Sequence, residues 1–226
     1  MNRNTILVAT MAVATLGSTA QSCVALATSA VGIAVLKQIL LGGITKGLNI
    51  FGDKNSFLAN NLIDAALPSQ LRDLNNTLQK LGLNSLVQKE KEYIAEAAAF
   101  TVETSRPILV NAVNSLTADD AARILQGGSG AATQILKERT SEQLMLAIAP
   151  KVDAKLNEFG LVQSLNSALT GTNLLSGIFG GQTNNGLTSG ISKFAAQQMV
   201  NGLFNIIESH EQQNSAAIMN SLSGAK

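Results

Sequence analysis

The chain has 226 residues, which suits one domain with a substantial core and a short export segment. Hydrophobic residues make up 46% of it but aromatic residues only 4%, so the core must be built from Leu, Ile, Val and Ala, which favours packed helices over an aromatic-rich β-sandwich. The 16 Lys and Arg residues face 15 Asp and Glu residues, and removal of Arg3 with the export segment leaves 15 of each, which excludes the basic field of a nucleic-acid-binding protein.

Residues 1–22 have the pattern of a bacterial export signal. A short start with one positive charge, Arg3, precedes an apolar run over residues 6–16 that is too short to span a bilayer. Cys23 is the only cysteine and follows this run directly after a small residue. We therefore predict a lipoprotein signal whose cleavage leaves Cys23 as the acylated N-terminus, anchored to a membrane.

Two other processing sites are compatible with the same stretch. Ordinary cleavage would occur after Ala20 or after Ala27, and Cys23 would then be an incidental thiol, since a lone cysteine forms no internal disulfide. Every one of these alternatives implies export, and with lipid on Cys23 the expected location is the bacterial cell envelope, anchored to a membrane in the periplasm. Residues 23–35, which are small and apolar, are predicted to form a tether or first helical turns.

A folded helical region is predicted to begin at residue 36. The run 36–51 has apolar residues at helical spacing. Polar residues interrupt it and argue against a membrane span: Lys37, Gln38 and Lys46. Residues 55–66 are predicted to form a second, short helix.

The next patterns are a leucine seam and a long helix. Leucines from Leu71 to Leu81 repeat at heptad spacing after Pro68, and Gly82 is suited to end that helix. The pattern over residues 85–116 is the longest in the chain. Pro107 lacks an N–H group, so we expect this helix to bend or break there.

The stretch from Thr117 to Thr140 reads as helix, double-glycine turn, helix. The Thr117 hydroxyl is placed to cap the first helix, and Asp120 completes a capping box. Gly127 and Gly128 then end it, and we expect one of them to have a positive φ angle.

Several short pieces of the chain occur in a characteristic order around this turn. They are Asp120-Ala121, Ile124-Leu125, Gly127-Gly128, Ala131-Ala132-Thr133 and Thr140, with Leu81-Gly82-Leu83, Pro107-Ile108, Pro150 and Gly202-Leu203-Phe204. Together they resemble the bacterial family called domain of unknown function 4197, from about residue 47 to about residue 217. The resemblance implies an exported helical protein and no assigned activity.

Helical patterns continue to the C-terminus. Thr140, with Gln143, predicts a second capping box and a new helix that Pro150 disturbs. Residues 170–190 are rich in Gly and Asn without a period, which predicts a long surface loop. Helices are expected over residues 191–211 and 216–222. The fold prediction is an all-α, irregular, single-domain bundle over residues 36–222, with proline-broken helices.

The apolar residues inside the predicted loop have two interpretations. They are Leu174, Leu175, Ile178 and Phe179. They either fold back onto the bundle or form a contact site for a partner or a membrane.

Motifs for catalysis or metal binding are not found. His210 is the only histidine, and Asn214 stands where a zinc-protease helix would need a second one, so no metal site is expected. The glycine turn lacks the spacing of a nucleophile elbow or a phosphate loop, so no cofactor is expected either. Glu103, Arg106 and Asp120 form the candidate polar site, with ordinary ion pairs as the alternative.

The sequence therefore predicts a cell-envelope helical protein that is non-catalytic and either structural or partner-binding. The alternative is a carrier of a small apolar ligand or lipid held in the bundle core, motivated by the aliphatic composition and the two prolines. An enzyme is the least favoured class.

Overall fold

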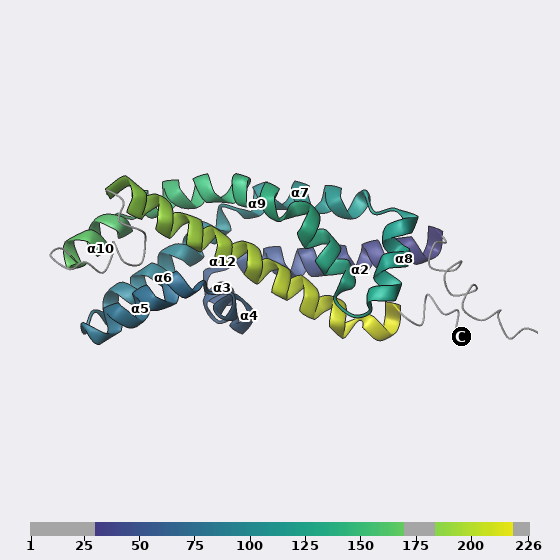
Figure 1. Cartoon of the computed structure of the whole chain (residues 1–226), viewed down its shortest axis with the longest axis horizontal. Helices are drawn as coiled ribbons and strands as arrows, with labels where there is room; N and C mark the ends of the chain where they lie inside the picture. Colours follow the sequence, from purple (N-terminus) through teal and green to yellow (C-terminus); the bar gives the residue numbers. More distant parts are fainter. Residues whose placement is uncertain (1–29, 170–183, 219–226) are drawn as a thin grey trace, which may run out of the picture.

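The computed structural model describes residues 30–169 and 184–218, and every element in these two ranges is a helix (Figure 1). The helices are α2 (Ala30–Gly52), α3 (Lys54–Leu58), α4 (Asn61–Ala65), α5 (Ser69–Lys80), α6 (Asn84–Ala99), α7 (Val102–Asn114), α8 (Ala118–Gly127), α9 (Ala131–Glu158), α10 (Leu161–Leu169) and α12 (Asn184–Gln213). The all-α prediction is confirmed for the described part of the chain. The predicted signal peptide, Cys23 and the apolar residues 174–179 lie outside the described residues.

Four long helices, α2, α7, α9 and α12, run along the long axis of an elongated bundle (Figure 1). α12 packs along α9 and α2, and α7 contacts the same two helices. The α5–α6 hairpin and α10 extend one end of the bundle, and α8 lies at the other end (Figure 1). The short α3 and α4 connect α2 to α5, with α3 packed on α6 and α4 on α12.

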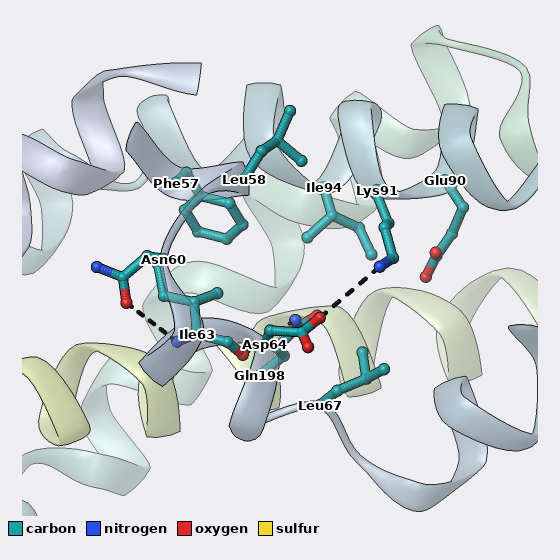
Figure 2. A pocket seen from close by; sticks show the side chains of 10 residues that line it. All are labelled: Phe57, Leu58, Asn60, Ile63, Asp64, Leu67, Glu90, Lys91, Ile94 and Gln198. Atoms are coloured by element: carbon teal, nitrogen blue, oxygen red, sulfur yellow. Dashed lines mark hydrogen bonds and ion pairs between the residues drawn. The ribbon is translucent and has the colours of Figure 1, made fainter. Parts of the chain in front are cut away.

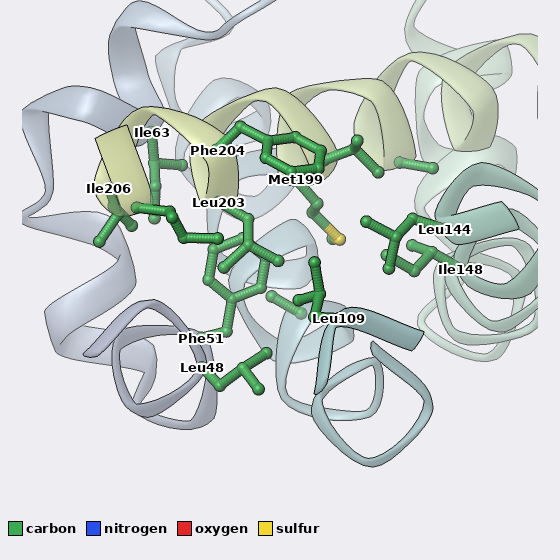
Figure 3. Close-up of a cluster of buried hydrophobic side chains, with 14 of the residues drawn as sticks. Leu48, Phe51, Ile63, Leu109, Leu144, Ile148, Met199, Leu203, Phe204 and Ile206 are labelled. Atoms are coloured by element: carbon green, nitrogen blue, oxygen red, sulfur yellow. The ribbon is translucent and has the colours of Figure 1, made fainter. Parts of the chain in front are cut away.

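The core is aliphatic, as the composition required. Each long helix contributes residues spaced three or four apart, which in α2 are Leu36, Leu40, Ile44, Leu48 and Phe51. Figure 3 shows side chains of α2, α7, α9 and α12 meeting in the middle of the bundle. The buried apolar residues form one continuous cluster, so the long helices depend on one another for burial.

α2 is the one helix within the described ranges that is long and apolar enough to cross a membrane, over Val31–Gly52. In the structure its apolar stripe belongs to the bundle core. Its Lys37 Nζ donates to the carbonyl of Asn114 at the end of α7 (2.7 Å). α2 is therefore packed here as a core helix.

Of the predicted bend or break at Pro107, a break does not occur. The helical run is interrupted at Phe100 and Thr101, and Pro107 lies inside α7. The Thr101 hydroxyl donates to the carbonyl of Ala98 (2.6 Å) at this interruption. Pro107 and Glu103, whose carbonyl loses its helical partner, are both exposed, so water can replace the missing hydrogen bond.

The predicted helix start at Thr140 is also wrong. α9 runs without interruption from Ala131 to Glu158 and contains both Thr140 and Pro150. Thr140 is buried, and its hydroxyl donates to the carbonyl of Leu136 (2.8 Å). A threonine hydroxyl can be satisfied by the carbonyl four residues earlier as well as at a helix N-terminus, which is why the local pattern misled.

Two predicted boundaries shift because helices extend into neighbouring segments. Residues 30–35 of the predicted tether form the first turns of α2. Residues 184–190 of the predicted loop form the first turns of α12. The remainder of that loop lies outside the described residues.

Candidate functional site

A buried carboxylic acid lies between α5 and α6. Glu90 is three residues after Val87 and four before Ile94, so the helical period places it on the buried face of α6. Asn75 has the same position on α5, four residues after Leu71 and within the buried stripe. The side chain of Glu90 is 0% exposed, which is rare for a residue that ordinarily carries a charge.

The two polar side chains satisfy each other only in part. Asn75 Nδ2 donates to Glu90 Oε2 (3.2 Å). Glu90 Oε1 and Asn75 Oδ1 are both buried without a hydrogen-bond partner. Burial raises the pKa of Glu90 to about 7, although the hydrogen bond from Asn75 and the charge of Lys91 act to lower it. Glu90 therefore exchanges its proton near neutral pH.

A cavity of about 40 Å³ reaches Glu90 from the side of α3, α4 and α12 (Figure 2). Its apolar wall includes Phe57, Ile63 and Ile94. Gln198 of α12 also lines it, with Nε2 donating to the carbonyl of Ile63 (3.3 Å) and Oε1 buried without a partner. Residues on two sides of the cavity therefore carry an unpaired acceptor, although both oxygens are closed to water in this structure, and one of the two amide N–H groups of Gln198 is used.

A second hollow of about 300 Å³ lies on the Asn75 side of the acid. Both hollows are lined by Asp64, Leu67 and Lys91. Lys91 Nζ lies 3.7 Å from Asp64 Oδ1, and this exposed ion pair appears as a dashed line in Figure 2. Such a pair contributes little stability, so it can open at small cost. We call the two hollows, with the acid between them, the acid cleft.

The polar site predicted from the sequence is not assembled as expected. Glu103 and Arg106 are exposed on α7. Asp120 is buried and forms an ion pair with Arg139 of α9 instead. Burial acts to raise the pKa of Asp120, but hydrogen bonds from Thr117 and Arg139 outweigh it and hold the pKa below its usual value.

The start and end of α8 are determined by local interactions. The Thr117 hydroxyl accepts from the backbone N–H of Asp120 (3.3 Å), and the N–H of Thr117 donates to the Asp120 carboxylate (2.9 Å). Gly127 is the last helical residue, and Gly128 has φ 73° and ψ −154°. That combination is accessible almost only to glycine, so Gly128 is the constrained residue of the turn.

Glu211, near the end of α12, binds the backbone that follows this turn. The sequence pattern did not identify this residue. Its carboxylate accepts from the N–H groups of Gly130 (3.1 Å), Ala132 (3.1 Å) and Thr133 (2.8 Å) and from the Thr133 hydroxyl (2.6 Å). These N–H groups belong to the first turn of α9, where the helix itself offers no acceptor. Glu211 thus supplies a cap from a residue about 80 positions later in the chain.

His210, next to Glu211, is half-buried against α2 rather than fully solvated. Burial, and then the charge of Lys46, lowers the pKa of His210. The described residues contain no group of three or more His, Cys, Asp or Glu side chains that could hold a metal ion.

Three residues of the acid cleft escaped the sequence analysis: Asn75, Glu90 and Gln198. A signal for them was present, because each is a polar residue at a position where the helical period requires an apolar one. The pairing of Asn75 with Glu90 depends on how α5 packs on α6. Periodicity alone does not specify that packing.

Comparison with protein families identifies the family of the chain. The family described as "Protein of unknown function (DUF4197)" matches residues 27–221, which is most of the chain. A search among curated proteins and a search among solved structures returned no match.

Proposed function

The chain belongs to the DUF4197 family, and we propose that it is a non-catalytic binding protein of the bacterial cell envelope whose binding site is the acid cleft. The observation that supports a binding site is the set of buried, unpaired acceptors beside a cavity, namely Glu90 Oε1 and Gln198 Oε1, with Asn75 Oδ1 behind them. A buried polar atom without a partner costs about 1–3 kcal/mol, so a ligand that supplies donors would recover free energy that the fold has lost.

The composition of the cleft favours binding over catalysis. Glu90 is the one buried titratable residue among those that line the smaller cavity, and the other two, Asp64 and Lys91, are exposed and paired with each other. Acid–base catalysis ordinarily needs a second group positioned to return or remove the proton. A single acid flanked by amides is suited to holding a ligand.

Attachment through lipid on Cys23 is the second part of this proposal. It is supported by the export pattern of residues 1–22. Because α2 is packed into the bundle, the lipid, and not this apolar helix, is proposed as the membrane attachment. Detergent partitioning of wild type and Cys23→Ala from the native host tests it: equal partitioning into the aqueous phase would refute the anchor.

The binding site is tested by replacing the acid with an apolar residue of similar length. We expect small molecules with N–H or O–H donors to shift backbone amide NMR signals of residues 90–94 and 63–67 in wild type but not in Glu90→Leu. Glu92→Leu, on the same helix but half-exposed, is the matched control and should behave as wild type. If no donor-bearing compound shifts these signals in wild type, the cleft is not a binding site.

The alternative function, a carrier of a small apolar ligand or lipid, is supported by a groove on the surface of the bundle instead of by its core. The core is filled, but a groove of about 440 Å³ runs along α9 and α12, lined mainly by Met145, Leu146, Ala149 and Pro150. Leu146 is 71% exposed there. Binding of a fluorescent fatty acid that is lost in Leu146→Asp and retained in Glu90→Leu would support this carrier function, and equal binding by all three proteins would refute the groove.

A further inference from the structure

We infer that the ligand of the acid cleft presents a primary ammonium group, which enters the cavity at Glu90 and displaces the carboxyl proton to solvent. This inference rests on the proposed binding function and names the ligand class. Four features of the described residues support it: the unpaired acceptor oxygens, the missing counter-charge, the size of the cavity and its small number of oxygen ligands.

The two amides near Glu90 each have an unpaired carbonyl oxygen. The Nδ2 group of Asn75 is used by Glu90, and the Nε2 group of Gln198 is used by the carbonyl of Ile63. The carbonyl oxygen of each amide has no partner, and neither has the second carboxyl oxygen of Glu90. An ammonium group has three N–H donors and no acceptor, so it complements this set.

The carboxylate of Glu90, when ionised, lacks a positively charged partner in the cleft. An ionised Glu90 is buried without an ion-pair partner, and buried charges are ordinarily paired. The basic side chains near Glu90 are paired with other acids or line the larger hollow. Lys91 pairs with Asp64, and Lys54 pairs with Glu92 and Glu96. Arg72 lines the hollow of about 300 Å³. A bound ammonium would supply the missing positive charge.

The dimensions exclude larger cations. A cavity of 40 Å³ accommodates about three water-sized groups, since one water needs roughly 10–15 Å³. That suits an ammonium group with one or two methylenes against Phe57 and Ile94, and the remainder of the ligand can lie in the adjoining hollow of about 300 Å³. A quaternary ammonium is too large and lacks N–H donors.

A metal ion fits less well than an ammonium group. Ca²⁺ and Mg²⁺ require about six to eight oxygen ligands. The residues that line the cavity carry the free oxygens of Glu90 and Gln198, which a ligand reaches only after these side chains move, and that of Asn75 lies behind them. The same ammonium chemistry is carried by a free small amine and by a lysine side chain, and we assign the free amine because the cavity holds only about 40 Å³.

The binding reaction is a proton exchange. The protonated carboxyl of Glu90 loses its proton to the buffer, the carboxylate accepts an N–H of the ammonium, and the amine keeps its charge throughout. Because the pKa of Glu90 is about 7, binding at about pH 6 should release about 0.9 proton per ligand, and binding at about pH 9 close to none.

The experiment is isothermal titration of the dialysed protein with n-butylamine hydrochloride at about pH 6, in two buffers with different ionisation enthalpies. We expect saturable binding with proton release in wild type and in Glu92→Gln. Glu90→Gln should lose at least tenfold in affinity and release no proton, because it removes a charge-assisted hydrogen bond. Lysine amide, titrated in parallel, should bind more weakly than butylamine, and tighter binding of lysine amide would transfer the assignment to a lysine side chain.

Failure of this inference is distinguishable from failure of the proposed function. If neutral n-butanol binds as tightly as butylamine, the cleft is a binding site but the ammonium assignment is overturned. If neither compound, nor any other donor-bearing molecule, shifts the amide signals of residues 90–94, both proposals are overturned. Equal loss of binding in Glu92→Gln and Glu90→Gln would attribute the effect to surface charge and also overturn the assignment.

Discussion

Replacement of Glu90 by glutamine should make the ligand-free protein more stable at alkaline pH. Glutamine keeps the shape of the side chain and an oxygen that can accept from Asn75, but it cannot ionise. The wild-type protein, in contrast, must hold a carboxylate in a fully buried position once the pH exceeds the pKa of Glu90. The substitution removes that cost.

The magnitude follows from the two pKa values. The pKa of Glu90 is raised from 4.5 to about 7 on folding, so the folded state binds the proton more tightly than the unfolded state. The associated stability is fully present below pH 4.5 and is lost as the pH rises through 7. The difference between the two pKa values corresponds to roughly 3 kcal/mol, which for a domain of this size is about 6–12 °C in melting temperature.

Urea denaturation of wild type and Glu90→Gln at about pH 5 and about pH 8 measures this effect. The free energy of unfolding of wild type should fall by about 2.5 kcal/mol between these conditions relative to the variant. Glu92→Gln, which alters a half-exposed acid on the same helix, should track wild type. A pH profile of Glu90→Gln that parallels wild type would refute the argument, because it would mean that Glu90 ionises in the folded state as readily as in the unfolded chain.

Three further substitutions test other parts of the structure. Gly128→Ala should lower the free energy of unfolding by about 1–3 kcal/mol, because the backbone angles of Gly128 are unfavourable for alanine. The control Gly52→Ala, at a helical position with open space around it, should raise the free energy of unfolding slightly. Equal effects of the two substitutions in urea denaturation would contradict the assigned turn. Glu211→Ala should lower the free energy of unfolding by about 3 kcal/mol or more, since it leaves several buried N–H groups without an acceptor. The control Glu208→Ala, on the same helix, should change the free energy of unfolding little. The lowered pKa of His210 means that the folded state prefers the neutral imidazole, so the stability of the protein should fall as the pH drops through 6.5. The melting temperature of His210→Gln should decline less over that pH range than that of wild type. An identical decline in the two proteins would exclude His210 as the cause.

Features that depend on a few consecutive residues were predictable from the sequence. The capping box of Thr117 and Asp120 and the helix end at Gly82 rest on side-chain and backbone chemistry within one turn. Thr140 and Pro107 show where such reasoning fails. Both have a local preference that the folded protein overrides, the first through a hydrogen bond to the preceding turn and the second through exposure to water.

The candidate site was less predictable because its members come from different helices. Glu90 and Asn75 are 15 residues apart and Gln198 lies on α12, so the cavity exists only after α4, α6 and α12 have packed. A polar residue at an apolar position of a helical stripe marks each of them individually. No pattern within one helix states that the three lie beside the same hollow.

The cap that Glu211 provides has a consequence for the order in which the chain can fold. α12 is made after α2, α4, α5 and α9, yet it packs on all four, and its end completes the first turn of α9. The segment made earlier lacks its main packing surface until α12 has been made, so the bundle cannot be completed before then. For a protein that we propose is exported, this dependence delays completion of the bundle until α12 has been made, which favours translocation of the chain before it has folded.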